Sequence, residues 1–114
     1  MTDQVAIVIP RPLFREGSAF TATAYFRDRA TAAASTPTNV YYRVDCLTTG
    51  QTVLDWTAGT PGASASIAVT AANNDIVSDS NQYEIKQLTV AADYGLATQV
   101  TESATWTVTN TLGV

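Results

Sequence analysis

The side chains of this sequence that could catalyse a reaction are carboxylates, because the chain contains no histidine. Without histidine the commonest general base is missing, and no Ser-His or Cys-His nucleophile can form. A glycosidase would need two acids held roughly 5–10 Å apart across a cleft. Two pairs could approach each other across neighbouring strands, Asp45 with Asp55 and Glu84 with Glu102. We expect all four to be solvated on outward strand faces, where no cleft would hold a substrate, and therefore expect no enzyme.

The sequence also gives little support to phosphate and metal sites. Its six glycines are scattered singly, and the lone cysteine, Cys46, cannot form a structural zinc site without histidine. The polar segment 73–81 contains Asn, Asp and Ser oxygens that suit calcium. It lacks EF-hand spacing, and the same residues are ordinary turn formers. A calcium site and a connecting loop both stay open, and we favour the loop, with no metal and no cofactor.

The composition indicates one soluble domain with a substantial core. Of the 114 residues, 46% are hydrophobic and only 14% are charged, and a single cysteine cannot form an intrachain disulfide. The net charge is −4 and the six basic residues do not cluster, which argues against nucleic acid or an anionic membrane as a partner. The opening residues, MTDQVAIVIP, have no basic region, and their apolar run is too short for a signal peptide. We therefore expect synthesis in a cytoplasm without a standard export signal.

Apolar residues alternate with polar ones along most of the chain, and this period of two predicts β-strands. Residues 18–27 show the pattern clearly, with Phe20 and Phe26 near the ends and alanines between them. The segments 39–47 and 52–57 flank a Thr-Thr-Gly-Gln turn, which predicts a hairpin. We expect about seven strands, in the ranges 4–9, 18–27, 39–47, 52–57, 64–69, 83–94 and 98–110.

About seven short strands, with a turn roughly every ten residues, are typical of an immunoglobulin-like sandwich. The fold class we predict is all-β: a single Ig-like antiparallel β-sandwich without a disulfide. Residues 1–17 would form an N-terminal strand and a proline-containing arm, packed on the domain or on a neighbour. Residues 18–114 would form the body of the sandwich, so the chain is one domain overall.

The sequence also allows predictions about single residues within the strands. Trp56 and Trp106 lie in phase with apolar positions, so we expect both to be buried in the core. Cys46 alternates with apolar neighbours and should be a small buried residue rather than a reactive thiol. The apolar phase slips near Lys86 and Gln87, which predicts a β-bulge there.

The N-terminal stretch is the best candidate for contact with a partner. Both faces of segment 4–9 are apolar, and such a strand usually packs on both sides. Segment 11–15 places an aromatic residue between arginines, a combination common among interface anchors, although a loop tucked over the end of the domain would look the same. Tyrosines on polar strand faces stack on sugars, anchor interfaces or simply cover a half-exposed sheet. The candidate interface residues are Val5, Ile7, Ile9, Arg11, Leu13, Phe14, Arg15, Tyr25 and Tyr41.

Three stretches resemble the immunoglobulin and fibronectin type III superfamily, and the likeness extends over nearly the whole chain. They are EGSAFT at 16–21, VYYRVD at 40–45 and LTVAADYG at 88–95. The cysteine pair of antibody domains is absent, so the likeness is to the members that lack a disulfide. Such motifs indicate a fold and say little about function.

Two further stretches, FRDR at 26–29 and ATWTVTN at 104–110, resemble the small Ig-like virion proteins of tailed bacteriophages. This resemblance implies a non-enzymatic structural protein of the virion, assembled in the host cytoplasm, either a capsid-stabilising head decoration protein or a neck or tail component. It implies the major capsid protein or other virion proteins as partners, and a homo-oligomer or symmetric array. The alternative is an Ig-like module that binds carbohydrate weakly on a cell surface through Tyr25, Tyr41 and the turns.

Overall fold

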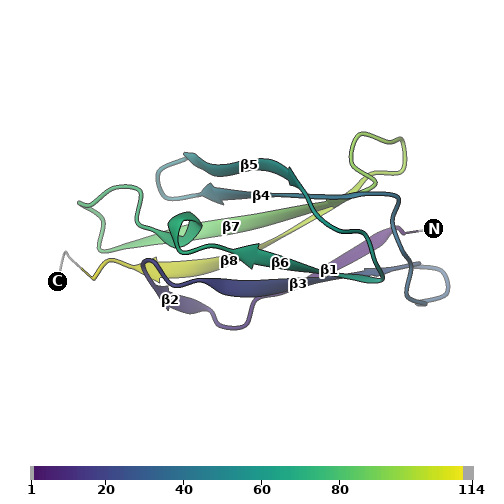
Figure 1. Cartoon of the computed structure of the whole chain (residues 1–114), viewed down its shortest axis with the longest axis horizontal. Helices are drawn as coiled ribbons and strands as arrows, with labels where there is room; N and C mark the ends of the chain where they lie inside the picture. The colour runs from purple at the N-terminus through teal and green to yellow at the C-terminus, as the bar shows by residue number, and fades with distance from the viewer. Residues whose placement is uncertain (1, 112–114) are drawn as a thin grey trace.

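The computed structural model describes residues 2–111, which form two β-sheets and no α-helix (Figure 1). The smaller sheet is antiparallel, with the order β1 (Gln4–Val8), β3 (Phe20–Arg27) and β6 (Ser64–Val69). The larger sheet has the order β2 (Leu13–Arg15), β8 (Val100–Thr109), β7 (Tyr83–Ala92), β4 (Val40–Cys46) and β5 (Thr52–Ala58). A short 3-10 helix, η1 (Ala72–Asn74), lies between β6 and β7. The predicted all-β class without a disulfide is confirmed.

The two sheets enclose one hydrophobic core, because alternate side chains of each strand point inward. In β3, Ala22, Ala24 and Phe26 are fully buried, whereas Thr23 and Tyr25 between them are half-buried and exposed, respectively. The alternation predicted for β3 and β6 is therefore confirmed. The larger sheet contributes inward side chains that close the other side of the core, among them Val44, Leu88, Val90, Trp106 and Val108.

Strand β2 corrects the expectation that segment 11–15 is a loop. Its three residues pair in parallel with the end of β8, Leu13 opposite Thr107 and Arg15 opposite Thr109. Three residues are too few to display a period of two, and their partner strand lies at the other end of the sequence. Pro12 accepts from the Thr107 amide but has no N–H to donate toward β8, so the pairing of the two strands begins at Leu13. The described residues thus form eight strands rather than about seven.

The predicted β-bulge near Lys86 and Gln87 is wrong. Strand β7 pairs with both β8 and β4 in unbroken register along this stretch. The apolar phase slips in the sequence because Glu84 and Lys86 occupy inward positions, where both side chains are fully buried. Ile85 between them faces outward and is exposed. Two buried charges, rather than an extra residue, therefore produce the irregular pattern.

Of the four candidate acids, Glu84 is buried rather than solvated, Asp45 is half-buried, and Asp55 and Glu102 are exposed as expected. The register of β7 and β8 does not place Glu84 opposite Glu102. Asp45 and Asp55 both contact one guanidinium, that of Arg43, at 2.9 and 4.0 Å. The hydrogen bonds that Arg43 donates to Asp45 raise the pKa of Arg43. Asp45 and Asp55 therefore belong to ion pairs.

The two tryptophans differ in burial. Trp106 is 2% exposed in the core, as predicted, and Cys46 is buried as expected. The prediction that Trp56 is buried in the core is wrong, because its side chain is half-buried and lies outside the core cluster. The predicted hairpin of β4 and β5 does form, but its register shifts around Val44. This shift places Trp56 beside Arg43, whose guanidinium carbon lies 5.5 Å from the centre of the indole.

Candidate partner interface

The end of the larger sheet that carries β2 presents two outward-facing rows of side chains. One row contains Leu13, Thr107 and Ile85, which are cross-strand partners on β2, β8 and β7. The next row contains Arg15, Thr109 and Tyr83 in the same strand order. We call these six residues the β2 face. None of them is acidic, which distinguishes this surface in a chain with a net charge of −4.

Large hydrophobic side chains are concentrated on the β2 face. Tyr83 is 59% exposed, Leu13 52% and Ile85 39%. Leu47 adjoins them, because its backbone N–H donates to the carbonyl of Ile85 at 2.8 Å, and its side chain is also exposed. Single exposed hydrophobic residues need no explanation, but a contiguous patch indicates a contact surface. The sequence predicted Leu13 as an interface residue but not Tyr83, Ile85 or Leu47. Tyr83 and Ile85 face outward because Glu84 between them is buried.

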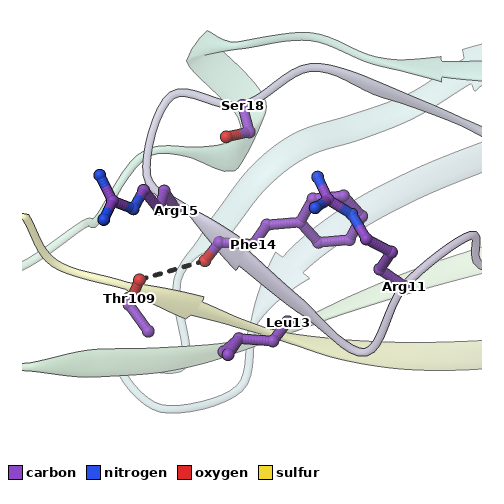
Figure 2. Close-up of a pocket in the computed structure, with 6 residues that line it drawn as sticks. All are labelled: Arg11, Leu13, Phe14, Arg15, Ser18 and Thr109. Carbon is purple, nitrogen blue, oxygen red and sulfur yellow. Dashed lines mark hydrogen bonds between the residues drawn. The ribbon is translucent and has the colours of Figure 1, made fainter.

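A surface hollow of about 360 Å³ lies along β2 beside this face (Figure 2). It is lined by Leu13, Phe14, Ser18 and Thr109, with Arg11 and Arg15 at its two ends. Figure 2 shows the Arg11 guanidinium over the Phe14 ring, 4.9 Å from the ring centre. Thr109 Oγ1 donates to the Phe14 carbonyl at 3.3 Å and so ties the wall of the hollow to β8. The hollow thus has a mixed lining, in which Leu13 is the exposed hydrophobic side chain and the two arginines are the charged ones.

The two arginines of the hollow differ from Arg43 and Lys86 in their ion pairing. Arg43 is held by Asp45, and Lys86 by Glu84. Within residues 2–111, Arg11 and Arg15 form no ion pair with a carboxylate. Their guanidinium groups therefore keep hydrogen-bond donors available for an incoming ligand.

The inner wall of the hollow is fixed by aromatic packing. The Phe14 ring is 3% exposed and stacks on Phe20, with ring centres 4.3 Å apart. Phe20 meets Trp106 edge-on at 5.1 Å. Trp106 Nε1 donates to Asn74 Oδ1 at 2.7 Å, and Asn74 Nδ2 donates to the Ser18 carbonyl at 2.8 Å. These buried contacts therefore connect Phe14 and Ser18, which both line the hollow, to Trp106 in the core.

The buried Glu84 fixes the loop that lies next to the β2 face. Its carboxylate accepts hydrogen bonds from the Val77 and Ser78 amides at 2.7 and 3.0 Å, from Asn81 Nδ2 at 3.0 Å and from Lys86 Nζ at 3.3 Å. Burial by itself would raise the pKa of Glu84, but these four hydrogen bonds outweigh it and lower the pKa to about 2. The group is therefore ionised at neutral pH and holds Lys86 inside the domain.

The remaining predicted interface residues lie away from the β2 face. Strand β1 pairs with β3, and its Val5 is buried in the domain's own core. Ile7 and Ile9 are partly buried against the same core. Tyr25 and Tyr41 are on the outer faces of different sheets, so the structure does not bring them together.

Tyr41 belongs instead to an aromatic cluster on the outer face of the larger sheet. Its ring centre is 4.7 Å from that of Tyr94, which lies 4.8 Å from Trp56. Arg43, clamped by Asp45, lies beside Trp56. The three rings are half-buried and form a second surface of mixed aromatic and polar character. Tyr94 and Trp56 carry no sequence signal that would have assigned them to it.

No protein-family model, curated protein or solved structure matches this chain. Among the described residues, no helix has the length and hydrophobicity needed to cross a membrane. The same residues contain no group of three or more acidic or cysteine side chains placed to hold a metal ion. In the segment considered for calcium, the Asn74 amide is already engaged by Trp106 and Ser18.

Proposed function

We propose that this chain is a non-enzymatic structural protein of a tailed-bacteriophage particle, specifically an Ig-like head decoration protein that stabilises the capsid. The observation that supports this proposal best is the β2 face, a surface with three exposed large hydrophobic side chains, an arginine and no acid. Its partner would be the major capsid protein or another virion protein. A neck or tail position would use the same face against a different virion component.

The strand order supports the immunoglobulin-like part of the proposal. The N-terminal segment divides between the sheets: β1 pairs antiparallel with β3, and β2 crosses to pair in parallel with β8. The remaining strands are antiparallel and enclose a single core, as in Ig-like sandwiches. The motifs at 16–21, 40–45 and 88–95 fall at the start of β3, in β4 and in β7.

The composition of the β2 face supports docking on a large assembly. Tyrosine and arginine are the residue types that most often dominate interface energies, and apolar neighbours exclude water around them. One small face buries less than the roughly 800 Å² per partner of a standard stable interface, so a single contact would be weak. Many copies on a symmetric particle would compensate through multivalency.

The test is quantitative mass spectrometry of density-purified particles, with the major capsid protein as the internal standard. We expect this chain at an abundance near that of the capsid protein, as a head decoration protein requires. A small fraction of that abundance would support a neck or tail position instead. Absence from intact, infectious particles would overturn the virion proposal.

The β2 face can be tested separately by adding purified chain to particles that lack it. We expect Tyr83→Ser to weaken particle binding by about tenfold, because an interface tyrosine commonly contributes more than 1 kcal/mol. Tyr25→Ser is the matched control, since Tyr25 is also exposed but lies on the other sheet. Equal loss in both variants would show that the β2 face is not the contact.

Carbohydrate binding is the second candidate function, and the aromatic cluster of Tyr41, Trp56 and Tyr94 favours it. Sugars stack on aromatic faces, and the neighbouring Arg43 and Asp45 offer donors and acceptors for hydroxyl groups. For this function we expect weak glycan-array signals that disappear in Trp56→Ala and persist in Tyr25→Ala. An array without signals for the native chain would remove this candidate.

A further inference from the structure

The open edge of β2 is available to a further strand. Among the described strands, β2 has a neighbour on one side only, which is β8. The Pro12 carbonyl and the Glu16 amide both bond to β8. Because backbone groups alternate in direction along a strand, Leu13 and Arg15 turn theirs toward the open edge, where the Arg15 carbonyl already accepts from the Ser18 amide at 3.2 Å. The Leu13 amide and carbonyl and the Arg15 amide are the groups that a further strand would use. An extended peptide could therefore pair with this edge, the recognition mode known as β-strand addition.

The residues that line the hollow along that edge indicate which side chains the peptide would carry. Its exposed hydrophobic side chain is Leu13, and about 360 Å³ is at the lower end of the roughly 300–1,000 Å³ of ligand pockets. That volume suits one or two apolar side chains rather than a large ligand. The guanidinium groups of Arg11 and Arg15 at its ends suit carboxylates, which they can bind through paired hydrogen bonds.

A second copy of this chain fits the hollow poorly. In a two-fold symmetric contact the same patch lies on both partners, so the arginines of one copy would approach those of the other. None of the six residues that line the hollow is acidic, so neither copy would offer a carboxylate there. The net charge of −4 on each copy adds further repulsion.

We propose that the edge of β2 binds an extended segment of a partner protein in which acidic and apolar residues alternate along one face, that is, at every second position. Two acidic residues on that face pair with Arg11 and Arg15, and the apolar side chain between them on the same face packs in the hollow beside Leu13. This inference rests on the proposed function in one respect: it names the chemistry of the virion segment that would dock on the β2 face.

The test uses the full chain and a fluorescent peptide that carries aspartate, valine and aspartate at every second position with serine between them, and binding is followed by fluorescence anisotropy. The control peptide has lysine in place of aspartate. We expect the acidic peptide to bind, the basic peptide not to bind, and added salt to weaken the complex. Absence of binding by the acidic peptide, or equal binding of both peptides, would overturn the proposal.

Charge reversal sharpens the test. We expect Arg15→Glu to weaken binding of the acidic peptide at least tenfold, and Arg11→Glu combined with Arg15→Glu to transfer the preference to the basic peptide. Arg29→Glu is the matched control, because Arg29 is equally exposed but lies in the loop between β3 and β4. If that control weakened binding as much as Arg15→Glu, net charge rather than the hollow would be responsible, and the proposal would fail.

The same variants separate this inference from the proposed function. If the chain is abundant in particles but the double reversal binds them normally, the acidic-segment inference fails and the virion role stands. If the chain is absent from particles but binds the acidic peptide through Arg11 and Arg15, the virion role fails and the inference stands.

Discussion

Replacement of Glu84 by alanine is expected to lower the free energy of unfolding by about 3–5 kcal/mol, the usual loss when one partner of a buried ion pair is removed. Both side chains of the Glu84–Lys86 pair are 0% exposed. The variant would leave the Lys86 ammonium in the core without its carboxylate. It would also remove the acceptor used by two loop amides and by Asn81. Urea denaturation, followed by tryptophan fluorescence, measures the difference.

Lys86→Met provides an informative comparison with Glu84→Ala. Without Lys86, the carboxylate of Glu84 still accepts three other hydrogen bonds, so this variant should lose less stability than Glu84→Ala. Glu102→Ala is the matched control, because Glu102 is exposed on the neighbouring strand and should change stability by no more than about 0.5 kcal/mol. A cost for Lys86→Met as large as that for Glu84→Ala would contradict this account.

The same carboxylate sets an acid limit to stability. In the unfolded chain Glu84 has its ordinary pKa of 4.5, and in the folded chain the pKa is lowered to about 2. The unfolded state therefore binds the proton more tightly, so the stabilisation is fully present above pH 4.5 and is lost as the pH falls toward 2. We expect the urea midpoint of the native chain to fall more than that of Glu84→Ala as the pH is lowered from 4.5 toward 2, because the variant lacks this carboxylate.

The pair at Glu84 and Lys86 also shows where sequence reasoning fails for this fold. A period of two located the strands correctly wherever inward residues were apolar, as in β3 and β6. In β7 the same rule placed charged residues on the outer face. A strand can nevertheless bury two opposite charges when they pair with each other in the core, as Glu84 and Lys86 do. The Val77 and Ser78 amides that bond the Glu84 carboxylate come from the loop just before β7, and a period of two does not reveal such hydrogen bonds. The bulge predicted near Lys86 was the consequence.

The candidate interface was only half predictable for the same reason. Leu13 and Arg15 could be selected from residue type alone, because an aromatic residue flanked by arginines resembles an interface anchor. Tyr83 and Ile85 join them only because Glu84 and Lys86 are buried, which turns their neighbours outward. The parallel pairing of β2 with β8 joins residues almost a hundred positions apart. Neither the burial of Glu84 and Lys86 nor the pairing of β2 with β8 can be recognised from neighbouring residues in the sequence.

The position of Trp56 illustrates a third limit. Trp56 and Leu54 have the same parity, and the sequence placed both inside. A register shift between β4 and β5 around Val44 changes the side on which Trp56 lies. Such a shift depends on both strands together, so it cannot be read from either strand alone.

Replacement of Trp106 by alanine is expected to cost about 3–5 kcal/mol, in the range for a large aromatic residue removed from a core. Trp106 is 2% exposed and touches Phe20 edge-on, so the cavity would open behind the wall of the β2 hollow. Phe14 stacks on Phe20 and would lose its support. We therefore expect weaker binding of the acidic peptide together with the lower urea midpoint.

Trp106→Phe separates packing from hydrogen bonding and stays informative if the alanine variant does not fold. It keeps an aromatic ring near Phe20 but removes the donor to Asn74 Oδ1, and Asn74 is 0% exposed. An acceptor left unpaired in the core costs about 1–3 kcal/mol, so we expect a loss in that range together with nearly normal binding of the peptide. If Trp106→Phe were as stable as the native chain, the hydrogen bond to Asn74 would not contribute to holding the hollow in place.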